Sequence, residues 1–269
     1  MRKLDKKINF LVVPVAMISL VALNSVTVYA ESESLSGTGK IEFSGEYPQD
    51  IVDPEKPGEI VDPGETPQLK GDLRIDFVPK LDFYQNKISD KDEVYYGNAQ
   101  NFFGATKPRG NFVQVTDLRQ KPTGWTLQLR QEMQFTNKDT KHTEIKGAML
   151  SLDKSWVSST KDMSNAPQLS KEIITIDNVG ASYNLAQANS GQGGGTWSIS
   201  FGASDENQNN QKNTLEPRLD KEGQAVLDPV FDNKPVYLNK AVSLSIPGTT
   251  IVDPVPYTTV LTWILAELP

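Results

Sequence analysis

Hydrophobic and polar residues alternate with a period of two through most of the chain from Leu73 onward. Leu73, Ile75 and Phe77 alternate with Arg74 and Asp76. The same alternation recurs from Trp125 to Phe135 apart from Gln131, from Ala148 to Leu152, from Trp197 to Phe201, from Val242 to Ile246, and from Tyr257 to Leu265. Successive side chains of a strand point to opposite faces, so each run predicts a strand with one buried face.

Turn-forming residues separate these runs. They lie at Lys121-Pro122-Thr123-Gly124, at Asn137-Lys138-Asp139, in the glycine-rich stretch 190–195 and in residues 205–213. No stretch sustains a 3.6-residue period, although residues 181–188 are compatible with two helical turns. The pattern predicts an all-β domain over residues 71–269, built as an antiparallel β-sandwich or barrel.

A proline-rich repeat precedes this domain. Residues 51–59 read Ile-Val-Asp-Pro-Glu-Lys-Pro-Gly-Glu, and residues 60–68 echo them. Proline lacks an amide donor and favours polyproline II, so we expect residues 48–70 to form a semi-stiff Pro/Asp-rich linker that reaches on the order of 60 Å when extended. The alternative is a surface loop lying on the domain. Residues 31–47 are a short N-terminal segment whose only strand-like patch is Ile41-Glu42-Phe43.

The N-terminus has the three parts of a secretory signal peptide. Arg2, Lys3, Lys6 and Lys7 form a basic region, residues 10–23 are almost wholly apolar, and Val28-Tyr29-Ala30 matches a cleavage pattern of small residues. The apolar run is short for ~30 Å of hydrocarbon, so cleavage after residue 30 is favoured over a retained membrane anchor. No later stretch is apolar for long enough to span a bilayer. We therefore expect an exported protein with no membrane anchor after signal cleavage.

Export makes the protein more acidic. Residues 1–30 contain four basic residues and one acidic residue, out of 27 and 34 in the whole chain, so the mature protein has 23 against 33 and a net charge of −10. Nucleic acids and anionic lipids are bound by clustered Lys and Arg, so this balance argues against both partners. The chain has no cysteine, so its stability rests on an ordinary core rather than on disulfides.

Catalytic and metal-binding patterns are weak. His142 is the only histidine and lies in a polar stretch, which indicates an isolated surface residue. No pair of carboxylates stands out as an acid and a nucleophile for a glycosidase. The stretch 191–195 lacks the Lys-Ser/Thr ending of a phosphate loop, and the acidic loop 205–210 does not have the calcium-loop spacing. We predict no enzymatic activity, no cofactor and no metal.

Two Trp-x-Leu triplets carry the functional information. The first is Trp125-Thr126-Leu127, and the second is Trp263-Ile264-Leu265, four residues before Pro269. Together with the export signal, the Pro/Asp-rich linker, Gly71 to Pro79 and Gly124, they resemble the WxL-domain cell-surface proteins of low-GC Gram-positive bacteria. The terminal triplet departs from that family's usual pattern at Ile264, where Thr is common, and in residues 266–268.

This resemblance implies an extracellular protein that attaches non-covalently to the Gram-positive cell wall by binding peptidoglycan. It also implies complexes with other exported surface proteins. The six triplet residues Trp125, Thr126, Leu127, Trp263, Ile264 and Leu265 are then candidates for a peptidoglycan-binding or a structural motif. The alternatives are a structural subunit that docks other exported proteins, and an adhesin for a host ligand.

The residues themselves leave two roles open for these tryptophans. An indole can stack on a sugar ring, or it can pack in a core, where its burial contributes roughly 3 kcal/mol. The core is favoured for Trp125, because Leu127 and Leu129 share its parity. For Trp263 both roles stay open. We hypothesise that Trp125 and Trp263 meet in space. Of the other two tryptophans, Trp197 is expected in the core and Trp156 as a half-covered packing residue.

Overall fold

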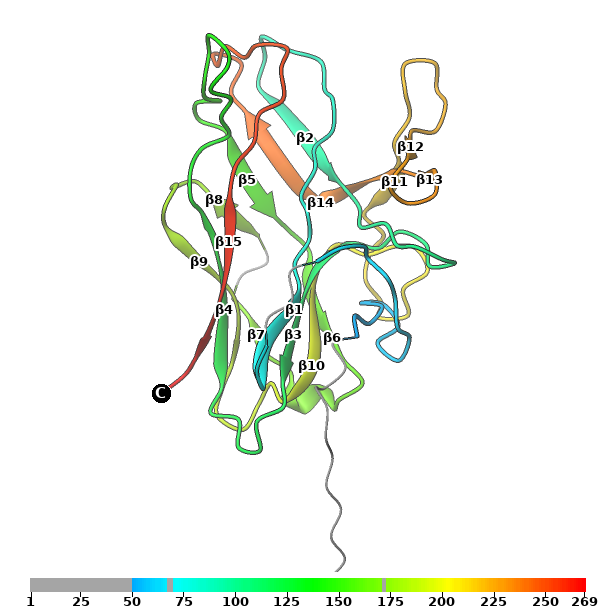
Figure 1. Cartoon of the computed structure of the whole chain (residues 1–269), viewed down its shortest axis with the longest axis vertical. Helices are drawn as coiled ribbons and strands as arrows, with labels where there is room; N and C mark the ends of the chain where they lie inside the picture. Colours follow the sequence, from blue (N-terminus) through cyan, green and yellow to red (C-terminus); the bar gives the residue numbers. More distant parts are fainter. Residues whose placement is uncertain (1–49, 67–69, 171–172) are drawn as a thin grey trace, which may run out of the picture. The chain divides into compact units, whose positions relative to one another are not determined.

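Three antiparallel sheets contribute to one hydrophobic core (Figure 1). The structure is a computed structural model that describes residues 50–66, 70–170 and 173–269. The predicted signal peptide, 1–30, and the segment 31–47 lie outside the described residues. Among the described residues, the only helical element is a short 3-10 helix, η1 (Met163–Asn165), and no helix is long and apolar enough to cross a membrane.

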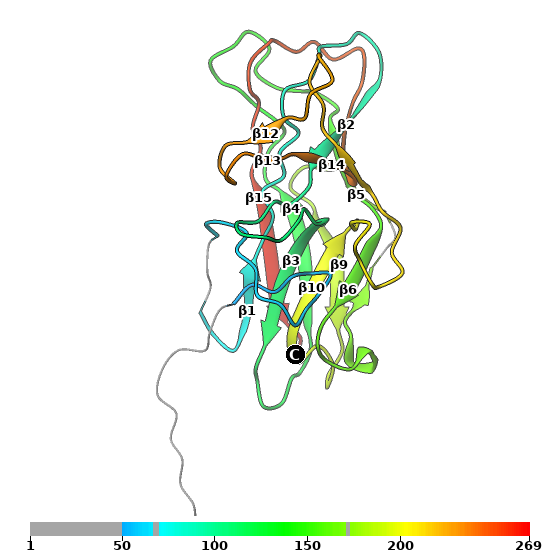
Figure 2. The same cartoon turned by 90° about the vertical axis from the view of Figure 1, so that its right-hand side faces the viewer.

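The first two sheets face each other as a sandwich. One has the order β1-β3-β10-β6, and the other has the order β15-β4-β9-β7. The strands of the first are β1 (Leu73–Phe77), β3 (Asn111–Asp117), β10 (Gly195–Phe201) and β6 (Ser155–Ser158). Those of the second are β15 (Leu261–Glu267), β4 (Trp125–Gln131), β9 (Ser182–Ala188) and β7 (Gln168–Leu169). Figure 2 shows β1, β3, β10 and β6 side by side, with β15 and β4 behind them.

The third sheet extends the core beyond the sandwich. Its order is β11-β14-β5-β8, and β2 also pairs with β14. The strands are β11 (Leu215–Pro217), β14 (Tyr237–Ile246), β5 (Met149–Leu152), β8 (Ile174–Ile176) and β2 (Glu93–Asn98). A small hairpin, β12 (Leu227–Asp228) with β13 (Lys234–Pro235), completes the strands. Every pair is antiparallel, which confirms the predicted all-β fold class.

The period-two pattern explains which faces are buried. In β4, Trp125, Leu127, Leu129 and Gln131 are buried while the residues between them are half-buried. The buried face joins Val113 of β3 and other apolar residues of all three sheets in one cluster. Burial of apolar surface at roughly 25 cal/mol per Å² is the main force that holds the sheets together. Residues 181–188, for which two helical turns were the alternative, form β9 instead, because the pairing of β9 with β4 adds a full strand to the sheet.

The repeat loop, residues 50–66, lies on the outer face of the β1-β3-β10-β6 sheet. Val52 N donates to Gln114 Oε1 at 2.9 Å, and Ser158 Oγ donates to Pro54 O at 2.5 Å. Ile51 and Val61, at equivalent positions of the two repeats, are buried in a second cluster with Phe77, Phe102 and Phe112. The extended-spacer interpretation is therefore wrong for these residues, which take the alternative of a loop packed on the domain.

A buried ion cluster fastens the same loop. The Arg109 guanidinium is almost wholly buried and lies 3.0 Å from Asp53, 3.5 Å from Glu55 and 3.2 Å from Glu206. Glu55 also accepts hydrogen bonds from the N–H and the hydroxyl of Ser204. Burial raises the pKa of Glu55 above its usual value, although the Ser204 hydrogen bonds and the Arg109 charge oppose this. Breaking such a pair leaves a buried charge uncompensated, so the cluster fixes the loop's position.

Candidate functional site

The two Trp-x-Leu triplets lie on neighbouring antiparallel strands, β4 and β15. Leu265 is opposite Leu127, Trp263 is opposite Leu129, and Glu267 is opposite Trp125. The strand that carries the second triplet thus completes the sheet beside the first triplet. The two tryptophans, however, are four residues apart along the ladder, roughly 13 Å. The hypothesis that the indoles meet is wrong, because the register pairs the leucines instead.

Trp125 is held in the core by the glycine-rich turn. Its side chain has no exposed surface, and its Nε1 donates to Gly193 O at 3.2 Å. Gly193 has a positive φ of 74°, and a Cβ at this position would lie 2.6 Å from the indole nitrogen. Only glycine permits this close approach. The stretch 191–195 is therefore a turn that closes over an indole, and the core interpretation of Trp125 is confirmed.

The other tryptophans are packed in the same manner. Trp197 is fully buried, with Nε1 donating to Gly194 O at 3.1 Å, as the core prediction required. Trp156 is 5% exposed, more buried than predicted, and donates to Gly202 O at 2.9 Å. Trp263 is half-buried and packs against the main core cluster. Three of the four indoles thus have no face available for a sugar ring.

An ion pair and hydrogen bonds fasten the end of β15 beside the first triplet. Arg119 bonds to Asp117 at 2.7 Å and to Glu267 at 2.5 Å, while Thr123 Oγ1 donates to Glu267 at 2.9 Å. A small hollow of about 350 Å³ lies at this end of the sandwich. It is lined by Asp117, Leu118, Arg119, Pro122, Lys161, Asn165, Gly191, Gly194 and Gly195. Arg119 is already paired with Asp117 and Glu267, so its charge is balanced within the chain.

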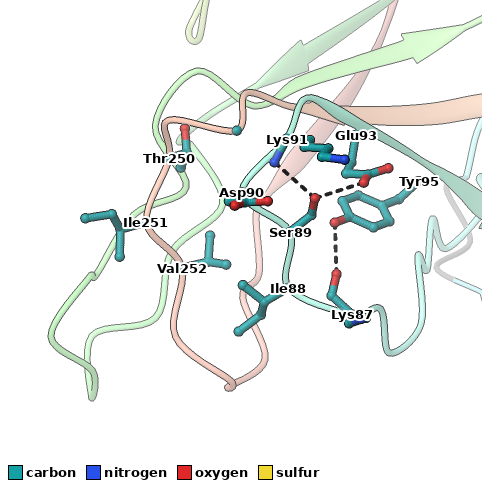
Figure 3. Close-up of a pocket in the computed structure, with 11 residues that line it drawn as sticks. Lys87, Ile88, Ser89, Asp90, Lys91, Glu93, Tyr95, Thr250, Ile251 and Val252 are labelled. Atoms are coloured by element: carbon teal, nitrogen blue, oxygen red, sulfur yellow. Dashed lines mark hydrogen bonds between the residues drawn. The ribbon is translucent and has the colours of Figure 1, made fainter.

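A larger hollow, of about 740 Å³, lies between the loop that precedes β2 and the loop that follows β14 (Figure 3). We call it the loop hollow. It is lined by Lys87, Ile88, Ser89, Asp90, Lys91, Glu93, Tyr95, Gly248, Thr250, Ile251 and Val252. The two loops meet because β2 pairs with β14 at this end, with Glu93 opposite Ile246. Sequence reasoning missed this site, since its two walls lie more than 150 residues apart.

The walls of the loop hollow are fixed by hydrogen bonds. Gly248 N donates to Asp92 Oδ1 at 2.9 Å, and a Cβ on Gly248 would lie 2.5 Å from the backbone of Lys91. Tyr95 Oη donates to Lys87 O at 3.1 Å, and Ser89 Oγ donates to Glu93 at 2.9 Å. Burial, and then the nearby Glu93 charge, raise the pKa of Tyr95. The tyrosine therefore remains a neutral hydrogen-bonding wall at physiological pH.

His142 is not isolated, contrary to the sequence interpretation. Its Nδ1 lies 2.9 Å from Asp253 Oδ1, and its backbone N–H donates to Asp253 at 2.8 Å. Asp253 belongs to a third Ile-Val-Asp-Pro, residues 251–254, that repeats the tetrapeptides at 51 and 60. The hydrogen bonds from Thr140, then from the His142 backbone and ring, hold the pKa of Asp253 far below its usual value. The third copy of the tetrapeptide is visible in the sequence, but its contact with His142 is not.

The acidic loop 205–210 has partners within the chain. Glu206 pairs with Lys107 and Arg109, and Asn207 Oδ1 accepts from the N–H groups of Asn209 and Gln211. In the described part of the chain, no group of three or more His, Cys, Asp or Glu side chains is arranged to hold a metal ion. The loop is thus built as a self-bonded turn.

Comparison with known proteins identifies the domain. A family model described as "WxL domain surface cell wall-binding" matches residues 30–269, which is most of the chain. Neither the search of curated proteins nor the search of solved structures found a match. The family is one of cell-wall-binding domains, which agrees with a location at the cell surface. On the strength of this match, and of the two triplets paired on adjacent strands, the chain belongs to the WxL-domain family of surface cell-wall-binding proteins.

Proposed function

We propose that this protein is exported, loses residues 1–30 as a signal peptide, and attaches non-covalently to the cell wall by binding peptidoglycan through its WxL domain. The observation that carries the proposal is the match to a surface cell-wall-binding family over residues 30–269. The acidic charge of the mature chain favours a ligand held by hydrogen bonds and apolar contacts over a polyanion of the wall. Other exported surface proteins are the second class of partner in this proposal.

In this proposal the six triplet residues act by building the sheet. Trp125 has no exposed surface, and Leu265 pairs with Leu127 across the two strands. The side chains of Thr126 and Ile264 lie on the opposite face from these, because side chains alternate along a strand. The motif thus supports a binding surface formed by other residues. The bounds 31–47, 48–70 and 71–269 remain proposals, with the described part of the Pro/Asp-rich segment, residues 50–66, packed on the domain at 71–269.

Sedimentation with insoluble peptidoglycan tests this function. Residues 31–269 are mixed with Gram-positive peptidoglycan stripped of teichoic acid, and the pelleted fraction is measured. We expect saturable binding that persists at high salt, because an acidic protein does not depend on counterion release. Protein that stays in the supernatant at every peptidoglycan concentration contradicts the proposal. N-terminal sequencing of protein recovered from a Gram-positive host tests export, with Glu31 expected as the first residue.

A second function, as a subunit that docks other exported proteins, is favoured by the free edge of β15. Glu132 N donates to Val260 O, and Leu268 N donates to Gly124 O. Since the bonded residues of an antiparallel strand alternate, the even-numbered residues of β15 bond to β4. The N–H and C=O groups of Leu261, Trp263, Leu265 and Glu267 therefore point away from β4, and β15 is the terminal strand of its sheet. An extended segment of another protein can add to such an edge.

Glu267→Pro tests this docking function. The substitution removes an N–H that points to the free edge without removing a backbone hydrogen bond to β4, but it also removes the side-chain contacts of Glu267 with Arg119 and Thr123. Glu267→Ala is therefore the matched control, because it loses the same side-chain contacts and keeps the N–H. Co-purification of exported partners from a native host should fall, whereas peptidoglycan sedimentation should not. Unchanged recovery of partners would exclude the edge as the docking surface.

A further inference from the structure

The loop hollow is open to solvent, and hydrogen bonds hold both of its walls in place. Its two walls are tied by the bond from Gly248 N to Asp92 and braced by Thr250 Oγ1, which donates to Lys146 O at 2.7 Å. Because the walls do not have to be ordered on binding, a ligand entering here avoids much of the usual entropic cost. A volume of about 740 Å³ is in the range of small-molecule sites.

Exposed apolar side chains line the mouth of the hollow. Ile251 is 65% exposed and Ile88 is 47% exposed, although both are large and apolar. Figure 3 shows Val252 between them. Ile251 and Ile88 lie outside the main core cluster and the residues packed against it, whereas Val252 packs against that cluster. Such a cluster suits the apolar face of a sugar ring and the methyl of an acetamido group.

Charged groups surround this apolar cluster. Lys87 and Lys91 line the hollow, and neither ammonium has an ion pair with a described residue. Asp90 also lines it and makes no side-chain hydrogen bond to a described residue, so its carboxylate is available to accept from sugar hydroxyls. Glu93 lines the hollow as well, so the two lysines stand beside two carboxylates. Such a mixed lining beside an apolar surface suits a ligand that combines hydroxyl or amine donors with carboxylates.

We propose that the loop hollow binds the muropeptide unit of peptidoglycan, an acetamido sugar that carries a short peptide with carboxylate groups. The apolar cluster contacts the sugar and its acetyl methyl, Asp90 accepts from hydroxyls, and Lys87 and Lys91 bind the peptide carboxylates. This inference rests on the proposed function, because it assumes that the wall ligand is peptidoglycan. It goes beyond that function in two ways: it locates the binding site on the domain, and it predicts that glycan carrying peptide binds more tightly than bare glycan.

The test uses soluble fragments and isotope-labelled protein, residues 31–269. A disaccharide–peptide released from peptidoglycan by a muramidase is titrated while amide NMR shifts are followed, with the disaccharide alone and the peptide alone as separate arms. The variants are Lys87→Ala/Lys91→Ala and Ile251→Ser. The matched control is Lys212→Ala/Lys221→Ala, which removes the same charge from two exposed lysines in other loops.

We expect shifts confined to residues 87–95 and 248–252, and affinity about tenfold weaker for the double lysine variant but unchanged for the control. The disaccharide alone should bind more weakly than the disaccharide–peptide. If the fragment shifts other residues, or if both lysine pairs behave alike, the inference is overturned while wall sedimentation of the intact protein still upholds the proposed function. If the intact protein does not sediment with peptidoglycan, the proposed function itself fails.

Discussion

Replacing Trp125 with alanine separates a structural motif from a ligand-contact motif. The side chain is fully buried, and its Nε1 donates to Gly193 O. Truncation of a buried Trp to Ala costs about 3–5 kcal/mol, and the hydrogen bond is part of that loss. A domain of this size typically has about 5–15 kcal/mol of stability, so the variant is expected to fold but to be much less stable.

Thermal unfolding followed by circular dichroism measures this loss. For a chain of 150–250 residues, 1 kcal/mol shifts the unfolding midpoint by about 2–4 °C, so a cost of about 3–5 kcal/mol should lower the Tm of Trp125→Ala by roughly 6–20 °C. Trp125→Phe, which keeps most of the volume and loses the hydrogen bond, should lower Tm by less. Thr126→Ala, on the opposite face of the same triplet, should have almost no effect.

Peptidoglycan sedimentation below the unfolding transition gives the decisive comparison. If the triplet builds the sheet, Trp125→Ala protein that remains folded should still sediment with the wall. Loss of sedimentation with an unchanged Tm would refute the reasoning, because it would make Trp125 a contact residue in spite of its burial.

Four further predictions address other parts of the fold. Deletion of residues 260–269 removes β15 and uncovers the edge of β4. We expect the cooperative unfolding transition, followed by circular dichroism, to be lost. An unchanged transition would show that β15 is dispensable. Gly193→Ala should lower Tm more than Gly191→Ala. Both glycines have a positive φ, but only a Cβ on Gly193 would be crowded, by Trp125 and by the Ala188 Cβ at 2.4 Å. Equal Tm shifts would show that this crowding does not contribute. Asp253 has a lowered folded pKa, so its contribution to stability is present above the unfolded pKa of about 3.9 and is lost as pH falls through the folded value. Asp253→Asn should remove this acid-dependent part of the Tm-versus-pH curve. Parallel curves for the variant and the unmodified protein would contradict this. Glu55 has a raised folded pKa, so its contribution to stability is present below the unfolded pKa of 4.5 and is lost as pH rises through the folded value. Glu55→Gln should flatten that loss above pH 4.5 in a Tm-versus-pH curve, and a steeper curve would count against it.

Local alternation was enough to predict the buried faces of several strands. Residues 73–77 form β1 over the predicted range, and Trp125, Leu127 and Leu129 form the buried face of β4. The pattern was less reliable where a strand ends. Met133 shares the parity of this face but is 44% exposed, because β4 stops at Gln131. Gln131, the last residue of β4, is buried although it is polar, and its Nε2 donates to Thr259 Oγ1 at 3.2 Å.

Contacts between distant residues were not predictable from one sequence. Composition favoured an extended spacer for the repeat loop, but Arg109, 56 residues away, pairs with Asp53 and fixes the loop on the sheet. Nothing in the local sequence identifies that partner, since Coulombic attraction depends on distance in space and not along the chain. The loop hollow was missed for the same reason, as its walls meet only through the pairing of β2 with β14.

The pairing of β15 with β4 also determines when the domain can finish folding. The two strands lie about 130 residues apart along the chain, so a polypeptide emerging from its N-terminus has made β4 long before β15 exists. Until then Leu127 and Leu129 lie at an open sheet edge, and the loop that must close to cover them is long. In the proposed export, in which the chain would cross the membrane unfolded, this order delays completion of the sheet until β15 has emerged. A chain that ends before β15 leaves the edge of β4 unpaired, and an unpaired sheet edge is prone to aggregation.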